Sequence, residues 1–167
     1  SKDLVETDAR DPGILIDDDG SAYLVFGTWN FYVSRLGADM ISLAEEPRLI
    51  TIDQPAGPYG PGKTDDKPSL HKHAGRYYLS WGCFYGIGES PYGPFSHRGA
   101  FIDEAHTDPL FRKELLLDRH GSFFDFRGRH YFICNDQSYP GSHIFYRNSV
   151  IAEVHYLPDG SIAPLEI

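Results

Sequence analysis

Three stretches of the sequence share one pattern: DDDGSAYLVFG at 17–27, KHAGRYYLSWG at 72–82 and DFRGRHYFICN at 125–135. The fourth residue of each is a glycine, and these glycines are 55 and 53 residues apart. A tyrosine follows three residues after each glycine, and apolar residues flank the motif on both sides. Because glycine adopts positive φ without strain, each stretch predicts a β-hairpin with a glycine in its turn.

Strand-rich repeats of about 40 to 55 residues are typical of β-propellers. We therefore expect an all-β fold, a partial β-propeller of about three four-stranded antiparallel blades. Residues 1–167 would form a single domain with blade-like units at about 8–58, 63–105 and 118–167. A β-sandwich is the alternative, but it does not require similar units at constant spacing. The best helix candidate, 110–117, is too short for more than a turn or two.

The composition limits the kinds of partner that the protein could bind. The net charge of −9 argues against nucleic acid, which needs a basic surface. No apolar run approaches the roughly 20 residues that span a bilayer. The sequence shows no signal peptide within it, so we expect either a cytoplasmic protein or a secreted one that has been trimmed. The 11 Tyr, 11 Phe and 2 Trp suit a sugar-binding surface or simply an aromatic sheet core. Cys83 and Cys134 lie in apolar strand patterns and read as buried thiols.

Candidate catalytic residues come from the repeat. Nine residues before the turn glycine stand Asp11 in the first unit and Asp66 in the second, while the third has Arg119 beside His120. The innermost strands of a propeller line one channel, so these equivalent positions would converge at its mouth. Carboxylates with a histidine there predict an acid–base site. Alternatively, the aspartates are turn residues that bond to the backbone.

Further motifs run in order along the chain, and they are DPGILIDDDGSAYLVFG at 11–27, DKPSLHKHAGRYYLSWG at 66–82, SPYGPF at 90–95, HGSFF at 120–124, YRNSV at 146–150 and PDGSI at 158–162. This ordered set resembles glycoside hydrolase family 43, the β-xylosidase and α-L-arabinofuranosidase type of five-bladed propeller. The resemblance covers this chain nearly from end to end, but the chain corresponds only to about the last three of the family's five blades.

The resemblance implies inverting hydrolysis of hemicellulose pentosides, either β-xylosides or α-L-arabinofuranosides. Asp66 would be the general acid, and Asp11 would keep it protonated by like-charge repulsion. His120 resembles a histidine near the channel axis that helps to hold a metal in some members. No cofactor is required, although a structural calcium could occupy the channel. Trp29 and Trp81 would stack on sugar or pack between blades, and Arg147 would grip a sugar hydroxyl or a channel carboxylate.

Two departures from the family pattern affect catalysis. Asp66 stands where the family has Glu, which moves the carboxyl by roughly 1.5 Å and would slow proton donation. The first-blade aspartate that acts as general base has no counterpart here, although inversion needs a second carboxylate roughly 6.5–9.5 Å from the acid. The alternative is a catalytically impaired carbohydrate-binding module that needs a partner chain or a second copy.

Three blades in an arc would leave two sheet faces without neighbours. We expect Leu15, Val25 and Phe31 on the open face of the first unit. We expect Phe132, Phe145 and Val154 on the open face of the third unit. Exposed apolar faces of this kind mark interfaces. The sequence therefore predicts a homodimer, or completion of the ring by another chain.

Overall fold

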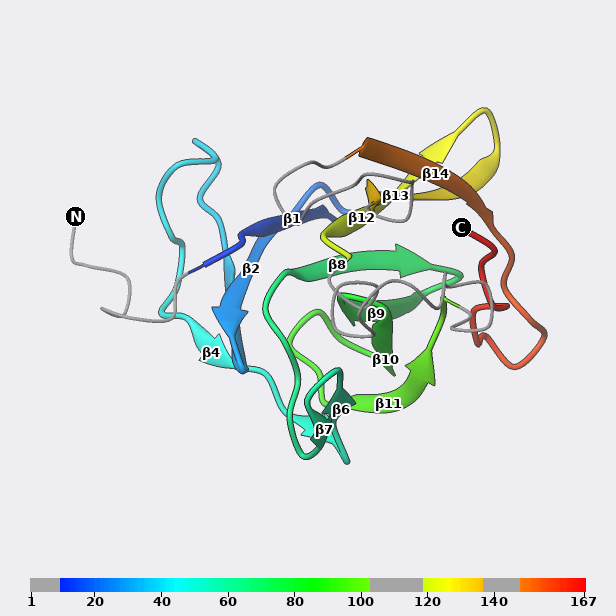
Figure 1. Cartoon of the computed structure of the whole chain (residues 1–167). Coiled ribbons are helices and arrows are strands. Elements are labelled where there is room, and N and C mark those ends of the chain that lie inside the picture. The colour runs from blue at the N-terminus through cyan, green and yellow to red at the C-terminus, as the bar shows by residue number, and fades with distance from the viewer. Residues whose placement is uncertain (1–9, 103–118, 137–147) are drawn as a thin grey trace.

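The computed structural model describes residues 10–102, 119–136 and 148–167, in which most strands form three mainly antiparallel sheets arranged around a common centre (Figure 1). The first sheet has the order β1 (Gly13–Ile16), β2 (Ala22–Thr28), β3 (Asn30–Arg35), β4 (Arg48–Leu49). The second has the order β8 (Pro68–His73), β9 (Arg76–Trp81), β10 (Phe84–Gly88), β11 (Phe95–Ala100), with β5 (Ile52–Asp53) added outside. The third has the order β12 (Gly121–Phe126), β13 (Arg129–Asp136), β14 (Asn148–Val154). A separate short hairpin pairs β6 (Ala56–Gly57) with β7 (Gly60–Pro61). These sheets confirm the all-β partial propeller.

The turn glycines adopt the predicted conformation, with φ of 82° at Gly20, 78° at Gly75 and 76° at Gly128. In the second and third sheets the turn has two residues, and the residue before the glycine, Ala74 or Arg127, also has positive φ. Two consecutive positive φ values give the tight turn whose twist matches that of paired strands. The repeat therefore fixes where each first strand folds back on the second.

The second sheet lies between the other two, and a separate apolar cluster fills each interface. Toward the first sheet it buries Leu79 and Trp81 against Val25 and Phe31. Its opposite face buries residues such as Tyr78 against Phe132 of the third sheet. Alternation along β9 explains this division, because successive side chains point to opposite faces. Cys83 and Cys134 are both buried in the cluster between the second and third sheets, as predicted.

The first strands of the three sheets lie nearest the common centre. β8 contacts β1 on one side and β12 on the other. The approach of β1 to β8 is close at Gly13, where an added Cβ would lie 2.9 Å from the carbonyl oxygen of Pro68. This arrangement brings together the segments that follow Asp11, Asp66 and His120.

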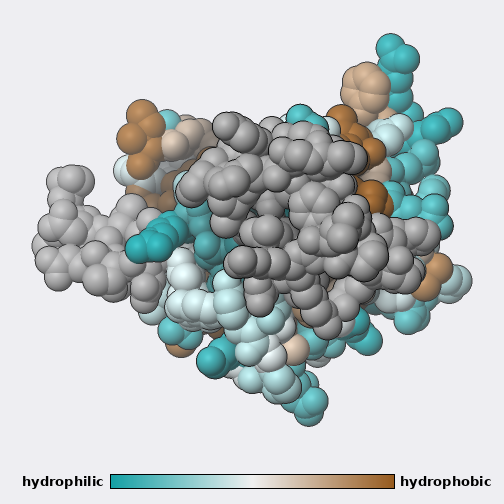
Figure 2. Space-filling view, in the orientation of Figure 1, coloured by the Kyte–Doolittle hydropathy of each residue, from teal (hydrophilic) through white to brown (hydrophobic). Residues whose placement is uncertain are grey.

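The prediction of which residues lie on the open faces is wrong. Leu15, Val25 and Phe31 are buried against the second sheet, as are Phe132 and Val154 on the other side. Exposed apolar residues stand instead at the alternate positions, and they are Ile14, Ile16, Leu49, Phe124, Phe126 and Ile151. Apolar surface gathers on the third-sheet side in Figure 2. Both faces of these strands are apolar, so alternation could not indicate which one meets the neighbouring blade. Phe145 lies outside the described residues.

The blade units differ in detail from the sequence ranges. β5 falls within the first unit by sequence, yet it pairs in parallel with β11 at the outer edge of the second sheet. The third sheet has three strands in its described part rather than four. The helix candidate at 110–117 lies outside the described residues. Within the described ranges there is no helix long and apolar enough to cross a membrane.

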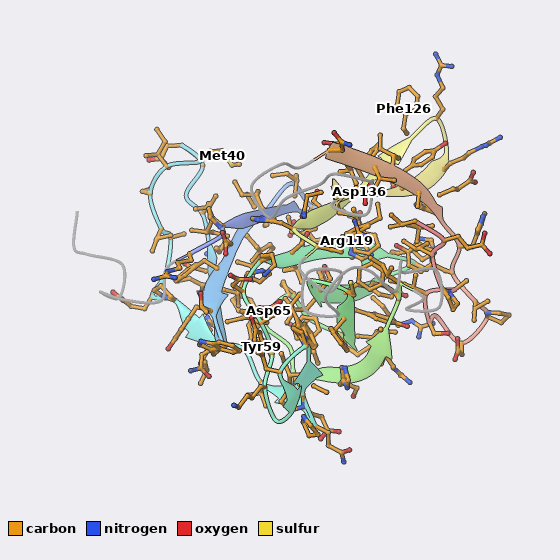
Figure 3. All side chains as sticks on the ribbon, in the orientation of Figure 1. Met40, Tyr59, Asp65, Arg119, Phe126 and Asp136 are labelled. Carbon is orange, nitrogen blue, oxygen red and sulfur yellow. The ribbon has the colours of Figure 1, made fainter. Side chains whose placement is uncertain are left out.

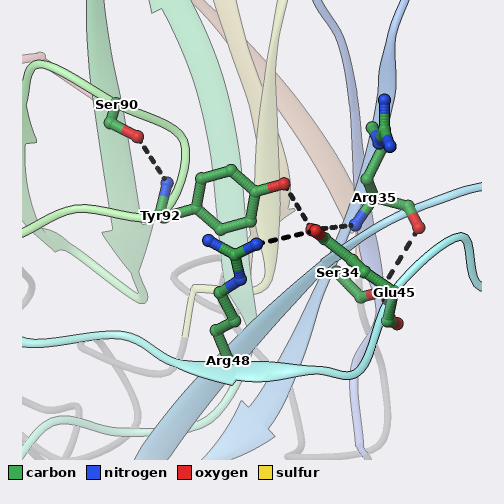
Figure 4. A network of polar contacts seen from close by, with 6 residues as sticks. All are labelled: Ser34, Arg35, Glu45, Arg48, Ser90 and Tyr92. Atoms are coloured by element: carbon green, nitrogen blue, oxygen red, sulfur yellow. Dashed lines mark hydrogen bonds and ion pairs between the residues drawn. The ribbon is translucent and has the colours of Figure 1, made fainter.

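A polar network fastens the outer part of the first sheet to the second (Figure 4). The Glu45 carboxylate accepts hydrogen bonds from the Tyr92 hydroxyl, from Arg48 at 2.9 Å and from the Arg35 amide at 3.1 Å. The Arg48 guanidinium also lies 4.3 Å from the centre of the Tyr92 ring. These bonds, led by that of Tyr92, hold the pKa of Glu45 below its usual range. The contacts tie the loop before β4 to the turn before β11.

Candidate functional site

The beginnings of the three innermost strands surround a cavity of about 420 Å³. Its lining comes from all three sheets and consists of Pro12, Gly13, Pro68, Ser69, His120, Gly121, Ser122, Ile133, Cys134, Asn135, Asn148 and Ser149. Asp11 immediately precedes Pro12 of this lining, and Asp66 stands two residues before Pro68. The two predicted aspartates therefore adjoin the cavity lining along the chain, and His120 belongs to the lining itself.

Asp11 occupies an unusual backbone conformation, with φ of 50°. Such a φ is uncommon for a residue other than glycine, although aspartate tolerates it better than most residues do. The segment is held by a hydrogen bond from the Gly27 amide to the Arg10 carbonyl of 3.0 Å. β2 thus fixes the backbone from which Asp11 projects at the start of β1.

Asp66 lies in a charged cluster with both of its neighbours. The Lys67 ammonium forms an ion pair with Asp66 and another with Asp65, at 3.2 Å from Asp65 Oδ2. The Lys67 side chain is only 7% exposed, so solvent screens these charges weakly. Lys67 has a φ of 63°, which turns the chain sharply between Asp66 and β8. The predicted general acid therefore has a buried cation as its immediate partner.

The third sheet contributes His120, which immediately precedes its innermost strand β12 and lines the cavity. The Asn135 side chain accepts a 2.5 Å hydrogen bond from the His120 amide, which fixes the backbone and leaves His120 exposed beside the cavity. The guanidinium of Arg119 is buried and donates to the Asn135 carbonyl at 2.8 Å and to Asp136 at 3.1 Å. Figure 3 shows Arg119 and Asp136 close together. Arg119 therefore ties β12 to β13, while His120 faces the site.

Trp29 lies in the turn between β2 and β3, next to the segment that leads to Asp66. Its side chain is 47% exposed and its φ is 64°. The Trp29 amide donates to the Asp65 carbonyl at 2.9 Å, and the Thr64 hydroxyl donates to the Trp29 carbonyl at 2.6 Å. The Trp29 turn is thereby fastened to the segment that ends in Asp66.

Trp81 does not have the exposed face that sugar stacking requires. The side chain is completely buried between the first and second sheets, 6.0 Å from the Phe31 ring centre and 5.7 Å from that of His97. Its indole N–H donates to the Ala56 carbonyl at 3.0 Å. Packing between blades, the alternative given above, describes this residue. Arg147 lies outside the described residues.

A second cavity, of about 300 Å³, lies at the opposite ends of the same three strands. His71 lies there between the rings of Tyr78 and Phe123, whose centres are 4.9 and 4.0 Å from that of His71. Its Nε2 forms a 2.8 Å hydrogen bond with the Tyr156 hydroxyl. Burial, together with the nearby imidazoles of His73 and His130, lowers the pKa of His71 to about 3. This end therefore holds a neutral histidine among aromatic rings, with Asp18, Lys72 and Asp125 also in the lining of the cavity.

Metal binding finds little support in the part of the chain that the structure covers. No group of three His, Cys, Asp or Glu side chains there is arranged to hold an ion. The described residues around His120 are small or neutral, so they do not complete a calcium site. A metal ligand role for His120 stays a prediction.

Three residues of the site were not predicted. Asn135 ends the third repeat motif, but nothing in the sequence indicates that it binds the His120 amide. Lys67 separates Asp66 from Pro68, and the sequence does not indicate its ion pair with Asp66. Tyr59, whose ring centre lies 4.9 Å from that of Trp29, stands in the stretch GPYGPG that reads as a loop. An aromatic residue between glycines is the signal that could have identified it.

The fold and the site together define a class: a β-propeller whose polar site lies where the innermost strands begin. The sequence profile described as "Glycosyl hydrolases family 43" matches residues 2–162. The chain therefore belongs to glycoside hydrolase family 43.

Curated relatives and solved structures agree with this assignment. The chain is 26% identical to a xylosidase/arabinosidase of Bacteroides ovatus, covering 93% of this chain and 57% of that protein. A β-xylosidase of Xylanibacter ruminicola is 25% identical over 91% of this chain and 56% of its own length. The crystal structure of the GH43_1 enzyme from Xanthomonas citri with xylose has a TM-score of 0.75 and 28% identity, over 93% of this chain and 55% of that one. The chain thus spans just over half the length of these relatives.

Proposed function

We propose that the chain takes part in inverting hydrolysis of hemicellulose pentosides, β-xylosides or α-L-arabinofuranosides, with Asp66 as general acid. The observation that supports the proposal is a cavity at which the three innermost strands begin: His120 belongs to its lining, and Asp11 and Asp66 stand one and two residues before the lining residues Pro12 and Pro68. Membership of the family and its xylosidase and arabinosidase relatives support the substrate class. Asp11 would tune Asp66 through its negative charge.

Inversion needs a second carboxylate that holds the attacking water across the sugar from the acid. Within the described residues we assign no side chain to this role. We propose that the base comes from a further part of the propeller or from a second copy. The acid then protonates the glycosidic oxygen, and the base removes a proton from water as it attacks the anomeric carbon.

Hydrolysis of aryl β-xyloside and aryl α-L-arabinofuranoside tests the proposal. Asp66→Asn keeps the side-chain size but cannot donate the proton, so any activity should fall by about 10²-fold or more. Replacement of His120 by Gln should cost less, because the histidine is not assigned a proton-transfer step. Equal activity of wild type and Asp66→Asn contradicts the role of Asp66.

A second candidate function is favoured by the ion pair between Asp66 and Lys67. A cation in contact with a carboxylate favours its ionised form, whereas a general acid must begin protonated. The second candidate is a carbohydrate-binding propeller with impaired catalysis. Lys67→Gly separates the two, because glycine suits a φ of 63° and removes the cation. If Lys67 limits catalysis, this variant gains hydrolysis, whereas Ala74→Gly, also at positive φ, should not. If the chain only binds, Lys67→Gly stays inactive.

We also propose that the outer faces of the first and third sheets are covered, either by a second copy or by another chain. Exposed apolar side chains of the first and third sheets support this proposal: Ile14, Ile16 and Phe124 line one open cavity, and Phe126 and Ile151 are exposed on the third sheet. Covering them would bury more than about 1,200 Å². Sedimentation velocity at micromolar concentration should show a dimer or larger species. A soluble, folded monomer contradicts the proposal.

A further inference from the structure

Trp29 and Tyr59 form an exposed aromatic corner next to the segment that leads to Asp66. Trp29, which is 47% exposed, meets Tyr59, which is 59% exposed, edge to face with an angle of 69° between their rings. The two residues come from different elements: Trp29 from the turn after β2, and Tyr59 from the hairpin of β6 and β7. Trp29 lines a surface cavity of about 270 Å³ together with Asn30, Gly62 and Lys63, and Tyr59 contacts the indole without belonging to this lining. Large aromatic rings left open to solvent next to polar groups are a common feature of binding sites.

The hairpin that carries Tyr59 is held rigidly. The buried Trp81 donates its indole N–H to the Ala56 carbonyl, and the Gly62 amide donates to the Pro55 carbonyl at 2.7 Å. Gly57 packs so closely that an added Cβ would lie 2.7 Å from the Thr64 carbonyl oxygen and 2.9 Å from that of Lys63. The buried Trp81 therefore helps to hold the hairpin that carries Tyr59 in place. Its buried indole is part of the same structural unit as the exposed ring of Tyr59.

Trp29 connects the corner to the acid. Its amide and carbonyl are both hydrogen-bonded to residues 64–65, directly before Asp66. Figure 3 shows Tyr59 and Asp65 in the same region. The corner lies outside the cavity formed by the three innermost strands, because Trp29 and Tyr59 are absent from its lining. The backbone bonds of Trp29 nevertheless place this corner next to the segment that leads to Asp66.

We propose that Trp29 and Tyr59 form a saccharide subsite for the leaving-group side of the substrate. The inference rests on the proposed function, since the general acid stands between the cleaved sugar and the leaving group. The ligand would be the next neutral pentose ring of an oligosaccharide, with its apolar face on the indole. Its hydroxyls would meet polar partners in Asn30 and Lys63. The site would thus distinguish an oligosaccharide from a monosaccharide.

Tryptophan fluorescence offers a direct test, because the chain has 2 Trp and the other one, Trp81, is completely buried. Xylotriose, and arabinotriose in a parallel titration, should shift the emission to the blue and protect Trp29 from acrylamide. Xylose should do so more weakly. Tyr59→Ala should weaken trisaccharide binding by about 3- to 10-fold, as expected for one aromatic contact. Ile41→Ala, which removes an exposed apolar side chain in the loop between β3 and β4, serves as the control and should bind normally.

The outcomes separate this inference from the proposed function. If either trisaccharide binds wild type and Tyr59→Ala equally and leaves Trp29 open to acrylamide, the subsite is overturned while the proposed function stands. If no saccharide binds or is hydrolysed by any variant, both fall. A Trp29→Phe variant checks the signal, because the remaining Trp81 emission should not respond to ligand.

Discussion

Acidification should destabilise the protein through His71, which lies in an aromatic slot at the far end of the innermost strands. The imidazole packs between Tyr78 and Phe123 and has one hydrogen-bond partner, Tyr156, among the residues described. Its Nδ1 is buried and has no partner in that part of the chain. Protonation would therefore add a charge and an N–H group that the slot does not satisfy.

The magnitude follows from the two protonation equilibria. The pKa of His71 is about 3 in the fold against 6.5 for an ordinary histidine. A depressed pKa means that the unfolded chain binds the proton first, so stability is complete above pH 6.5 and declines as the pH falls toward 3. Between pH 7 and pH 5 this histidine should remove about 2 kcal/mol of unfolding free energy. For a chain of this size the melting temperature would fall by roughly 4–8 °C.

Urea unfolding at pH 7, 6 and 5 measures the effect in wild type and in His71→Leu. Leucine fills the slot but cannot bind a proton, so the variant should be less stable at pH 7 yet lose about 2 kcal/mol less on acidification. His155→Gln, at an exposed histidine, is the control and should follow the wild-type curve. Parallel curves for wild type and His71→Leu would refute the reasoning.

Two further changes test contacts between the first and second sheets. Gly13→Ala should cost about 1–3 kcal/mol in urea unfolding, because the new methyl group would lie 2.9 Å from the Pro68 carbonyl oxygen; an unchanged midpoint would show that the strands can separate freely. Asp17→Asn should also cost about 1–3 kcal/mol, because Asp17 is paired with Lys72 and accepts a 2.5 Å hydrogen bond from the Tyr77 hydroxyl. Burial raises the pKa of Asp17, but the hydrogen bonds from Lys72, Tyr77 and the Asp18 amide outweigh it and leave a lowered pKa. The contribution of Asp17 should therefore be present at neutral pH and lost as the pH falls below about 4, and a variant with wild-type acid stability would contradict this.

The fold was readable from sequence because the turn glycines at positions 20, 75 and 128 impose their conformation locally. The same spacing predicted that the strands following Asp11, Asp66 and His120 lie side by side, and β8 does contact both β1 and β12. Which face of a strand meets its neighbour was not readable, because Ile14 and Leu15 are both apolar and only the assembled sheets distinguish them.

The role of Trp81 was equally hidden. A tryptophan after an inner strand fits both an exposed platform and a buried support. The difference depends on Ala56, whose carbonyl accepts the indole hydrogen bond from a distant hairpin. The contact between Lys67 and Asp66 joins chain neighbours, but its burial depends on the surrounding sheets.

The position of β5 has a consequence for any exchange of blades between related proteins. Residues Ile52 and Asp53 follow the first sheet in sequence but complete the edge of the second, in parallel with Phe95 and Ser96. A recombination junction placed at the sequence repeat, just before β8, would therefore transplant the second blade without its outermost strand. A junction placed between Leu49 and Ile52 would move the blade whole. Chimeras built by shuffling these units should accordingly tolerate the earlier crossover better than the later one.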